Sequence, residues 1–185
     1  MVVKNIIKNV AKVLFRDDLV QAVDSISPTS EQTSDINFIL MCLNFVNNTI
    51  ATDYINLESE VEVDNNSGLI PFSSICQDNI LDVVCVKDLF GNKLKFKVLH
   101  NGVEAPKGRV KIKYAYFPDE LKLSDSFTYY NTHLTERIIT YGVLSEYFYI
   151  KGNFDDASLW DSRFKQALLS STRKLRNIVM PKREW

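Results

Sequence analysis

The residue types that most often carry catalysis are scarce in this chain. Its two histidines stand apart: His100 falls in an expected hairpin loop, and His133 falls in the first turn of an expected helix. Neither histidine has a nucleophile or an acid beside it in the pattern of a local catalytic motif, although a Ser-His-Asp triad can assemble from distant positions. A hydrolase that uses His100 or His133 therefore stays an alternative, and we assign no catalytic residue.

Metal and phosphate chemistry also lacks its usual sequence patterns. The three cysteines, Cys42, Cys76 and Cys85, show no Cys-x-x-Cys spacing, and no group of Cys, His and Asp has metal-ligand spacing. The six glycines form no phosphate-binding loop. We therefore expect no metal, no cofactor and no enzymatic activity, and we interpret Cys42 and Cys85 as small core residues.

Alternating charges in the middle of the chain are more informative. Two basic rows lie in expected strands and comprise Lys93, Lys95, Lys97, Arg109, Lys111 and Lys113. An acidic row of the same period comprises Glu58, Glu60 and Glu62. If the two basic strands pair with each other, their like charges destabilise the sheet unless something neutralises them.

Three kinds of neutralisation are open for the basic rows. Water and salt are the first, and the acidic row is the second, either in this chain or in a neighbouring copy. The second arrangement makes all nine charged residues candidates for a subunit interface. Nucleic acid is the third, although the aromatic residues of these strands alternate to the other face, where bases have no access to them.

The end of the chain is basic and partly apolar. The residues of this tail that we expect to bind a partner are Arg173, Lys174, Arg176, Ile178, Met180, Lys182, Arg183 and Trp185. A free tail would expose a tryptophan and an Ile-Val-Met run to water, so we expect it to dock with Trp185 as its anchor. Packing of the tail on the chain's own body is the alternative.

Composition sets the frame for these features. The chain has 185 residues, of which 45% are hydrophobic and 24% charged, with a net charge of −1. Such a chain can bury a core without disulfides, and its net charge gives no argument for nucleic acid. We find no membrane span, and an odd number of cysteines without a signal peptide predicts synthesis in a reducing cytoplasm.

Hydrophobic periodicity divides the chain into helices, then strands, then helices. The expected helices cover 3–15, 17–23, a stretch beginning at 35, 133–151 and about 156–173, and the expected strands cover 57–63, 80–87, 94–98 and 109–116. Expected helix caps are Ser34 for the third helix and Asn131 or Thr132 for the fourth, which Gly152 ends.

These elements predict an α+β fold that is mainly helical. We expect a helical bundle with an inserted small antiparallel β-sheet or hairpin, followed by a C-terminal helical hairpin and a tail. The expected division is one domain over 1–176, with helices in 1–53, a β-region in 54–118 and a helical hairpin in 131–176. Residues 177–185 form the docking tail.

The order of these elements and three sequence stretches resemble the head-to-tail adaptor proteins of tailed bacteriophages, also called connector or neck-ring proteins. The stretches are "KIKYAYFPDEL", "ERIITYGVLSEYFYIKGNFDDASLWDSRFKQAL" and "MPKREW". The resemblance runs from about residue 30 to residue 185 and is most specific over 114–168. There a Tyr-x-Tyr-x-Pro strand end precedes a helix that ends in glycine and a helix that starts with aromatic-Asp-x-Ala-x-x-Trp.

The resemblance implies a structural virion protein at the head–tail junction, made in the bacterial host cytoplasm. Proteins of that family form rings, commonly of twelve copies, under the portal of the filled capsid and offer a platform for the tail. For this chain it implies a portal contact on residues 173–185 and subunit contacts on the β-region and on exposed faces of the long helices. Further implied partners are other neck or tail proteins, with DNA only passing through the channel and no membrane.

Two other functions stay open at this point. Another neck or tail-completion protein would share the same location in the virion. From a different class, a nucleic-acid-binding module would use the basic strand face.

Overall fold

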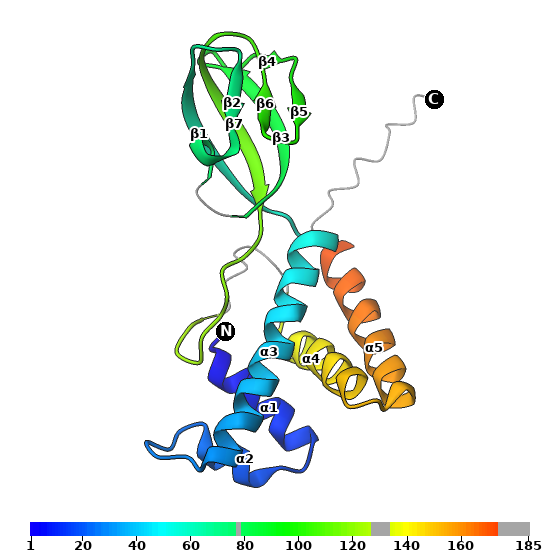
Figure 1. Ribbon diagram of the computed structural model, residues 1–185. Helices are drawn as coiled ribbons and strands as arrows, with labels where there is room; N and C mark the ends of the chain where they lie inside the picture. Colours follow the sequence, from blue (N-terminus) through cyan, green and yellow to red (C-terminus); the bar gives the residue numbers. More distant parts are fainter. Residues whose placement is uncertain (77–78, 127–133, 174–185) are drawn as a thin grey trace, which may run out of the picture. The chain divides into compact units, whose positions relative to one another are not determined.

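The computed structural model describes residues 1–76, 79–126 and 134–173 (Figure 1). The chain divides into two compact units. The helical unit comprises Met1–Asn47 and the chain from Glu120 onward, and the β unit is Asn48–Asp119. Over the described residues the fold is α+β, with 48% helix and 25% strand.

The expectation of a mainly helical bundle with a small inserted sheet or hairpin is wrong. The β unit holds two antiparallel sheets, with strand orders β1-β7-β3-β4 and β2-β6-β5 among the described residues. The second sheet consists of β2 (Leu69–Pro71), β5 (Lys97–Leu99) and β6 (Gly102–Glu104). Strands of three residues are too short for a period of two to become visible in the sequence.

The first sheet places the longer strands side by side. It consists of β1 (Leu57–Asn65), β7 (Gly108–Tyr116), β3 (Ile80–Asp88) and the short β4 (Lys93–Leu94). A short 3₁₀ helix, η1 (Phe72–Ser74), follows β2. Both sheets contribute to one apolar core, whose buried members are Ile70, Ile75, Val83, Val86, Val103, Ala105, Val110, Ile112 and Tyr114.

Two irregularities in β3 explain why buried and exposed residues do not alternate along this strand. Its register against β7 shifts between Ile80 and Asp82 and again between Val83 and Cys85. Such bulges insert an extra residue and turn the strand. Val83 and Val86 are therefore both buried, while Val84 between them is 40% exposed.

The expected strand over 94–98 is divided between the two sheets. Lys93 and Leu94 pair with β3, whereas Lys97 pairs with Glu104 of β6. Neither β4 nor β5 pairs with β7. The two basic rows therefore do not lie opposite each other.

The helical unit contains α1 (Val3–Val13), α2 (Asp17–Ala22), α4 (Glu136–Ile150), α5 (Phe154–Arg173) and most of α3 (Ser30–Asp53). Helix α1 packs against α2 and α4, and α4 packs along α5 (Figure 1). The buried side of α1 consists of Val3, Ile6, Ile7, Val10 and Ala11. These positions recur at helical spacing, as the apolar pattern predicts.

Helix α3 begins earlier than expected. It starts at Ser30, and the expected start at Asp35 with Ser34 as cap is wrong. The Thr29 hydroxyl accepts from the Gln32 amide at 3.2 Å, and the Gln32 side chain accepts from the Thr29 amide at 3.0 Å. This reciprocal pair is a capping box, and its signature "TSEQ" stands in the sequence.

The turn between α4 and α5 has the expected glycine. Gly152 has φ +79°, its amide donates to the Tyr149 carbonyl at 3.0 Å, and the Asn153 amide donates to the Phe148 carbonyl at 2.9 Å. Asn153 then precedes α5 and donates to Asp156 at 2.6 Å. Helix α4 begins at Glu136, and the Thr135 hydroxyl caps it by accepting from the Ile138 amide at 3.4 Å. The expected start at 133 with Asn131 or Thr132 as cap is therefore wrong. Asn131, Thr132 and His133 themselves lie outside the described residues.

Candidate functional site

The acidic row of β1 lies beside the basic row of β7 within the β unit. In register, Glu60 is opposite Lys113 and Glu62 is opposite Lys111. Lys113 Nζ lies 2.5 Å from Glu58 Oε2, and Lys111 Nζ lies 3.0 Å from Glu62 Oε1. Of the arrangements that the sequence left open, the structure therefore has the acidic row neutralising a basic row of the same chain.

Hydrogen bonding across the two rows moves the titration of both partners. The Lys111 ammonium lowers the pKa of Glu62, and Glu62 in turn raises the pKa of Lys111. Arg109 Nη2 lies 3.3 Å from Glu62 Oε2 and extends the same network. These side chains are open to solvent, so salt screens their attraction. Their role as subunit-interface residues stays a prediction.

The other basic row is not neutralised in this way. Lys93 pairs in register with Lys87 of β3, and Lys87 pairs with Lys111 on its other side. Among the described residues, no carboxylate forms an ion pair with Lys87 or Lys93. Like charges on neighbouring strands destabilise a sheet. The sequence did not single out Lys87, because it ends an apolar run. Lys95 is exposed between β4 and β5.

The turn between β3 and β4 presents two apolar side chains to solvent. Asp88 Oδ1 accepts from the amides of Phe90 at 2.9 Å and Asn92 at 2.8 Å, and Gly91 has φ +88°. The Asp88 amide donates to the Asn92 carbonyl at 3.0 Å, which closes the turn. Phe90 is 91% exposed and Leu89 51%. We call Leu89 and Phe90, held by this turn, the hairpin tip.

A pocket of about 390 Å³ opens between α4 and α5 in the helical unit. Its lining residues are Ser145, Glu146, Tyr149, Phe154, Ala157, Ser158 and Asp161, and we call it the helix-hairpin pocket. The rings of Tyr149 and Phe154 meet edge to face with centroids 5.6 Å apart, and each residue is 63% exposed. Ala157 is buried, and its carbonyl accepts from the Ser145 hydroxyl at 3.2 Å.

Glu146 gives this pocket an unbalanced negative charge. Burial, and then the charge of Asp161, raise the pKa of its carboxyl. Asp161 is paired with Lys165 at 2.8 Å, whereas no described residue forms an ion pair or a hydrogen bond with the Glu146 side chain. A partly buried carboxylate is stabilised by a nearby cation. The pocket therefore favours a positively charged group beside Glu146.

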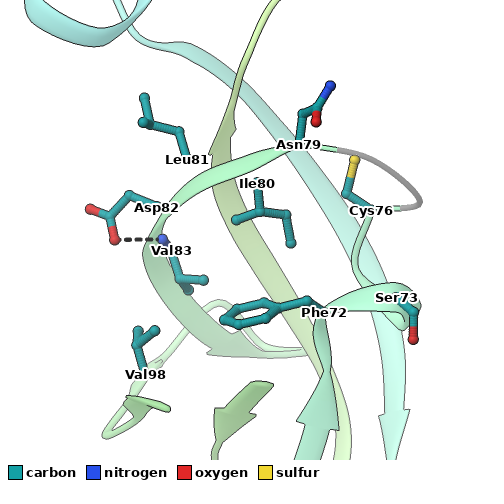
Figure 2. Close-up of a pocket in the computed structure, with 9 residues that line it drawn as sticks. All are labelled: Phe72, Ser73, Cys76, Asn79, Ile80, Leu81, Asp82, Val83 and Val98. Atoms are coloured by element: carbon teal, nitrogen blue, oxygen red, sulfur yellow. Dashed lines mark hydrogen bonds between the residues drawn. The ribbon is translucent and has the colours of Figure 1, made fainter. Parts of the chain in front are cut away.

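A second pocket, of about 400 Å³, lies in the β unit (Figure 2). Figure 2 shows the Phe72 ring beside the side chains of Ile80 and Val83. Asp82 Oδ1 accepts from the Val83 amide at 2.8 Å, so this carboxylate is engaged by its own backbone. The remaining lining residues are Ser73, Cys76, Asn79, Leu81 and Val98. We assign this pocket no catalytic role.

The remaining candidates from the sequence are dispersed. His100 is exposed in the turn between β5 and β6. Cys42 is buried, as expected, and burial raises its pKa to about 12. Cys85 is only half-buried, because it takes the register position opposite Lys113 and not one in the core. Arg173 ends α5, and the other tail candidates, Lys174 to Trp185, lie outside the described residues.

No family model matches the chain, and no curated protein matches it significantly. In the described part of the chain, no helix combines the length and the apolarity that a bilayer crossing requires.

Proposed function

We propose that this chain is a structural protein of the head–tail junction of a tailed bacteriophage, where copies form a ring that joins the portal to the tail. The observation that carries this proposal is the pair of exposed apolar features on one chain, the hairpin tip and the helix-hairpin pocket. Large apolar side chains that are held in place and left in water mark surfaces for protein partners. A ring requires two different patches that meet, and this chain offers two.

The residues that carry the family resemblance support the proposal by their structural roles. Tyr114, at the Tyr-x-Tyr-x-Pro strand end, is a member of the β core. Gly152 ends α4, and Ala157 and Phe164 are buried along α5. Gly152, Ala157 and Phe164 fix a helical hairpin that precedes the tail in the sequence. A rigid hairpin would set the direction in which the tail leaves the ring.

The decisive experiment uses the portal protein and electron microscopy. We expect the full chain, mixed with the portal, to form rings on it, and we expect a variant lacking residues 177–185 to keep its fold and lose the ring–portal complex. A second variant has Lys174, Arg176 and Lys182 replaced by Gln. Its portal binding shows how much the charges of the tail contribute when the apolar residues, including Trp185, are kept. A full chain that does not bind any component of the capsid vertex would contradict the proposal.

A nucleic-acid-binding module is the second candidate, and the unpaired lysines favour it. If DNA were the partner, replacing Lys87 and Lys93 by Gln would weaken DNA retention more than replacing Lys111 and Lys113, because the latter are paired with glutamates. Retention would also fall steeply with salt. Under our proposal, the full chain shows no salt-dependent DNA retention beyond that of the variants.

Another neck or tail-completion protein is the third candidate. Such a protein would bind the virion at the same junction without forming a closed ring on the portal. Electron microscopy of the complex therefore separates it from the adaptor by symmetry alone.

A further inference from the structure

We propose that the hairpin tip of one copy, Leu89 and Phe90, inserts into the helix-hairpin pocket of a second copy. This inference rests on the proposed function, because it names the contact that repeats from subunit to subunit around the ring. Both surfaces are present on every copy, in different compact units. A contact between two unlike patches leaves one tip and one pocket free on each pair, so it can continue until the ring closes.

Shape is the first support for this contact. The Asp88 carboxylate fixes the turn through the amides of Phe90 and Asn92, so little conformational freedom remains to be lost when the tip binds. The pocket of about 390 Å³ is lined in part by Tyr149 and Phe154, whose rings contact each other and are largely exposed. Aromatic rings favour edge-to-face and offset contacts with one another. A single aromatic anchor in a pocket commonly dominates the energy of an interface.

Charge is the second and independent support. Lys93 directly follows the turn and faces Lys87, and neither lysine has an ion-pair partner among the residues that the structure describes. Glu146, which lines the pocket, has a partly buried carboxylate and likewise no described cation. Insertion of the tip brings an unpaired cation to an unpaired anion. Complementary charges of this kind select the partner and fix the register more than they add affinity.

Photo-crosslinking tests where the tip lies. Phe90 is replaced by the photoreactive amino acid p-benzoyl-phenylalanine in the full chain, which is then mixed with an equal amount of ¹⁵N-labelled protein and irradiated, with and without portal. We expect cross-links from residue 90 to the segment 145–161 in a product with the mass of two chains. The photoreactive residue should lie on an unlabelled peptide and the cross-linked segment on a ¹⁵N-labelled one. Cross-links within a single chain, cross-links to other segments, or none at all would overturn the proposal.

Charge reversal tests why the tip binds there. Lys93→Glu and Glu146→Lys are each expected to weaken self-association by about tenfold, measured by sedimentation, and the double variant is expected to regain most of it. Lys107→Glu, an equal change at another exposed position of the β unit, serves as the control and should leave association unchanged. Failure of the double variant to recover would contradict the pairing.

The outcomes separate this contact from the proposed function. Rings on the portal with cross-links outside 145–161 would refute the contact and leave the adaptor function standing. Cross-links from the hairpin tip to the helix-hairpin pocket in a chain that does not bind the portal would refute the function and leave the contact standing. Leu89→Ser combined with Phe90→Ser should abolish self-association without unfolding, because both side chains are exposed in the single copy.

Discussion

Gly142 in α4 lies directly against Val46 in α3. A Cβ atom added to Gly142 would be 2.9 Å from Val46 Cγ1 and 3.0 Å from a ring carbon of Phe164 in α5. Real Cβ atoms essentially never come closer than 3.0 Å to another atom, and a contact of 3.0 Å is tighter than nine in ten real ones. The backbone of Gly142 is ordinary helix, so its φ angle does not require a glycine. The close packing of α3 and α5 against α4 requires it instead.

Replacing Gly142 by Ala is expected to destabilise the protein. Alanine favours a helix over glycine by about 1 kcal/mol, but overpacking a core costs roughly 1–3 kcal/mol. Because two rigid neighbours are contacted at once, we expect a net loss of about 1–2 kcal/mol in chemical denaturation. Val46→Ala in the same chain should recover part of the loss. Additive effects of the two changes would show that the contact is not tight.

The ion pair of Lys111 and Glu62 makes stability depend on pH at both extremes. The folded pKa of Glu62 is lowered from 4.5, so its contribution is present above the unfolded pKa and is lost as pH falls through the folded pKa. The folded pKa of Lys111 is raised from 10.5, so its contribution is present below that value and is lost as pH rises through the folded pKa.

Glu62→Gln is therefore expected to flatten the acid limb of a plot of unfolding free energy against pH. Glu60→Gln is the matched control, because Glu60 shares the row but makes no ion pair with any described residue. Chemical denaturation across a pH series measures both. Equal effects of the two variants would show that the charge of the row matters and the specific pair does not.

Loss of the Asp88 carboxylate is expected to loosen the hairpin tip. Asp88→Ala removes the acceptor for the amides of Phe90 and Asn92, so both amides should exchange with solvent deuterium faster. Asp88→Asn keeps an oxygen at the same place and should preserve most of the protection. Unchanged exchange in the alanine variant would mean that the backbone alone holds the turn.

Cysteine reactivity is expected to follow burial. Cys42 is buried, with its pKa raised to about 12, so almost no thiolate forms near neutral pH. A maleimide at pH 7.5 should label Cys85, which is only half-buried, and spare Cys42 until denaturant is added. Peptide mapping by mass spectrometry reads out each site. Rapid labelling of Cys42 in the native protein would show that the helical core opens.

The sequence predicted the helices better than the sheets, for a physical reason. A helix such as α1 repeats its apolar face over several turns, so its pattern is visible without knowledge of the neighbours. Its end fell at Val13, two residues before the expected end, because Phe15 adopts a left-handed conformation with φ 56°. The early start of α3 was also readable, from the capping box of Thr29 and Gln32.

The sheets depended on information that one strand does not contain. The acidic row of β1 was visible, but which strand lies beside it is a long-range choice that neither strand's own residues determine. The passage from β4 to β5 occupies two residues, Lys95 and Phe96, and it moves the chain from one sheet to the other. Because of the bulges in β3, a simple alternation could not predict that Val83 and Val86 are both buried.

The candidate surfaces were harder to predict than the fold. The hairpin tip resembled an ordinary turn in the sequence, and its exposure became evident only from the structure. The helix-hairpin pocket draws lining residues from two helices and required their packing to be known. The charged rows were identified from sequence alone, but the unpaired state of Lys93 depends on Lys87 in a neighbouring strand.

Strand β1 is an edge strand of its sheet among the described residues, where β7 is its only hydrogen-bonded neighbour. Such an edge invites a second molecule to add a strand, which is a common start of aggregation. Antiparallel joining of two β1 edges in a symmetric register would set Glu58, Glu60, Glu62 and Asp64 of one copy opposite acidic residues of the other. Lys111, Lys113 and Arg109 neutralise only part of this charge. The acidic residues of β1 therefore disfavour strand addition at this edge, and with it aggregation of the protein into continuous β-structure.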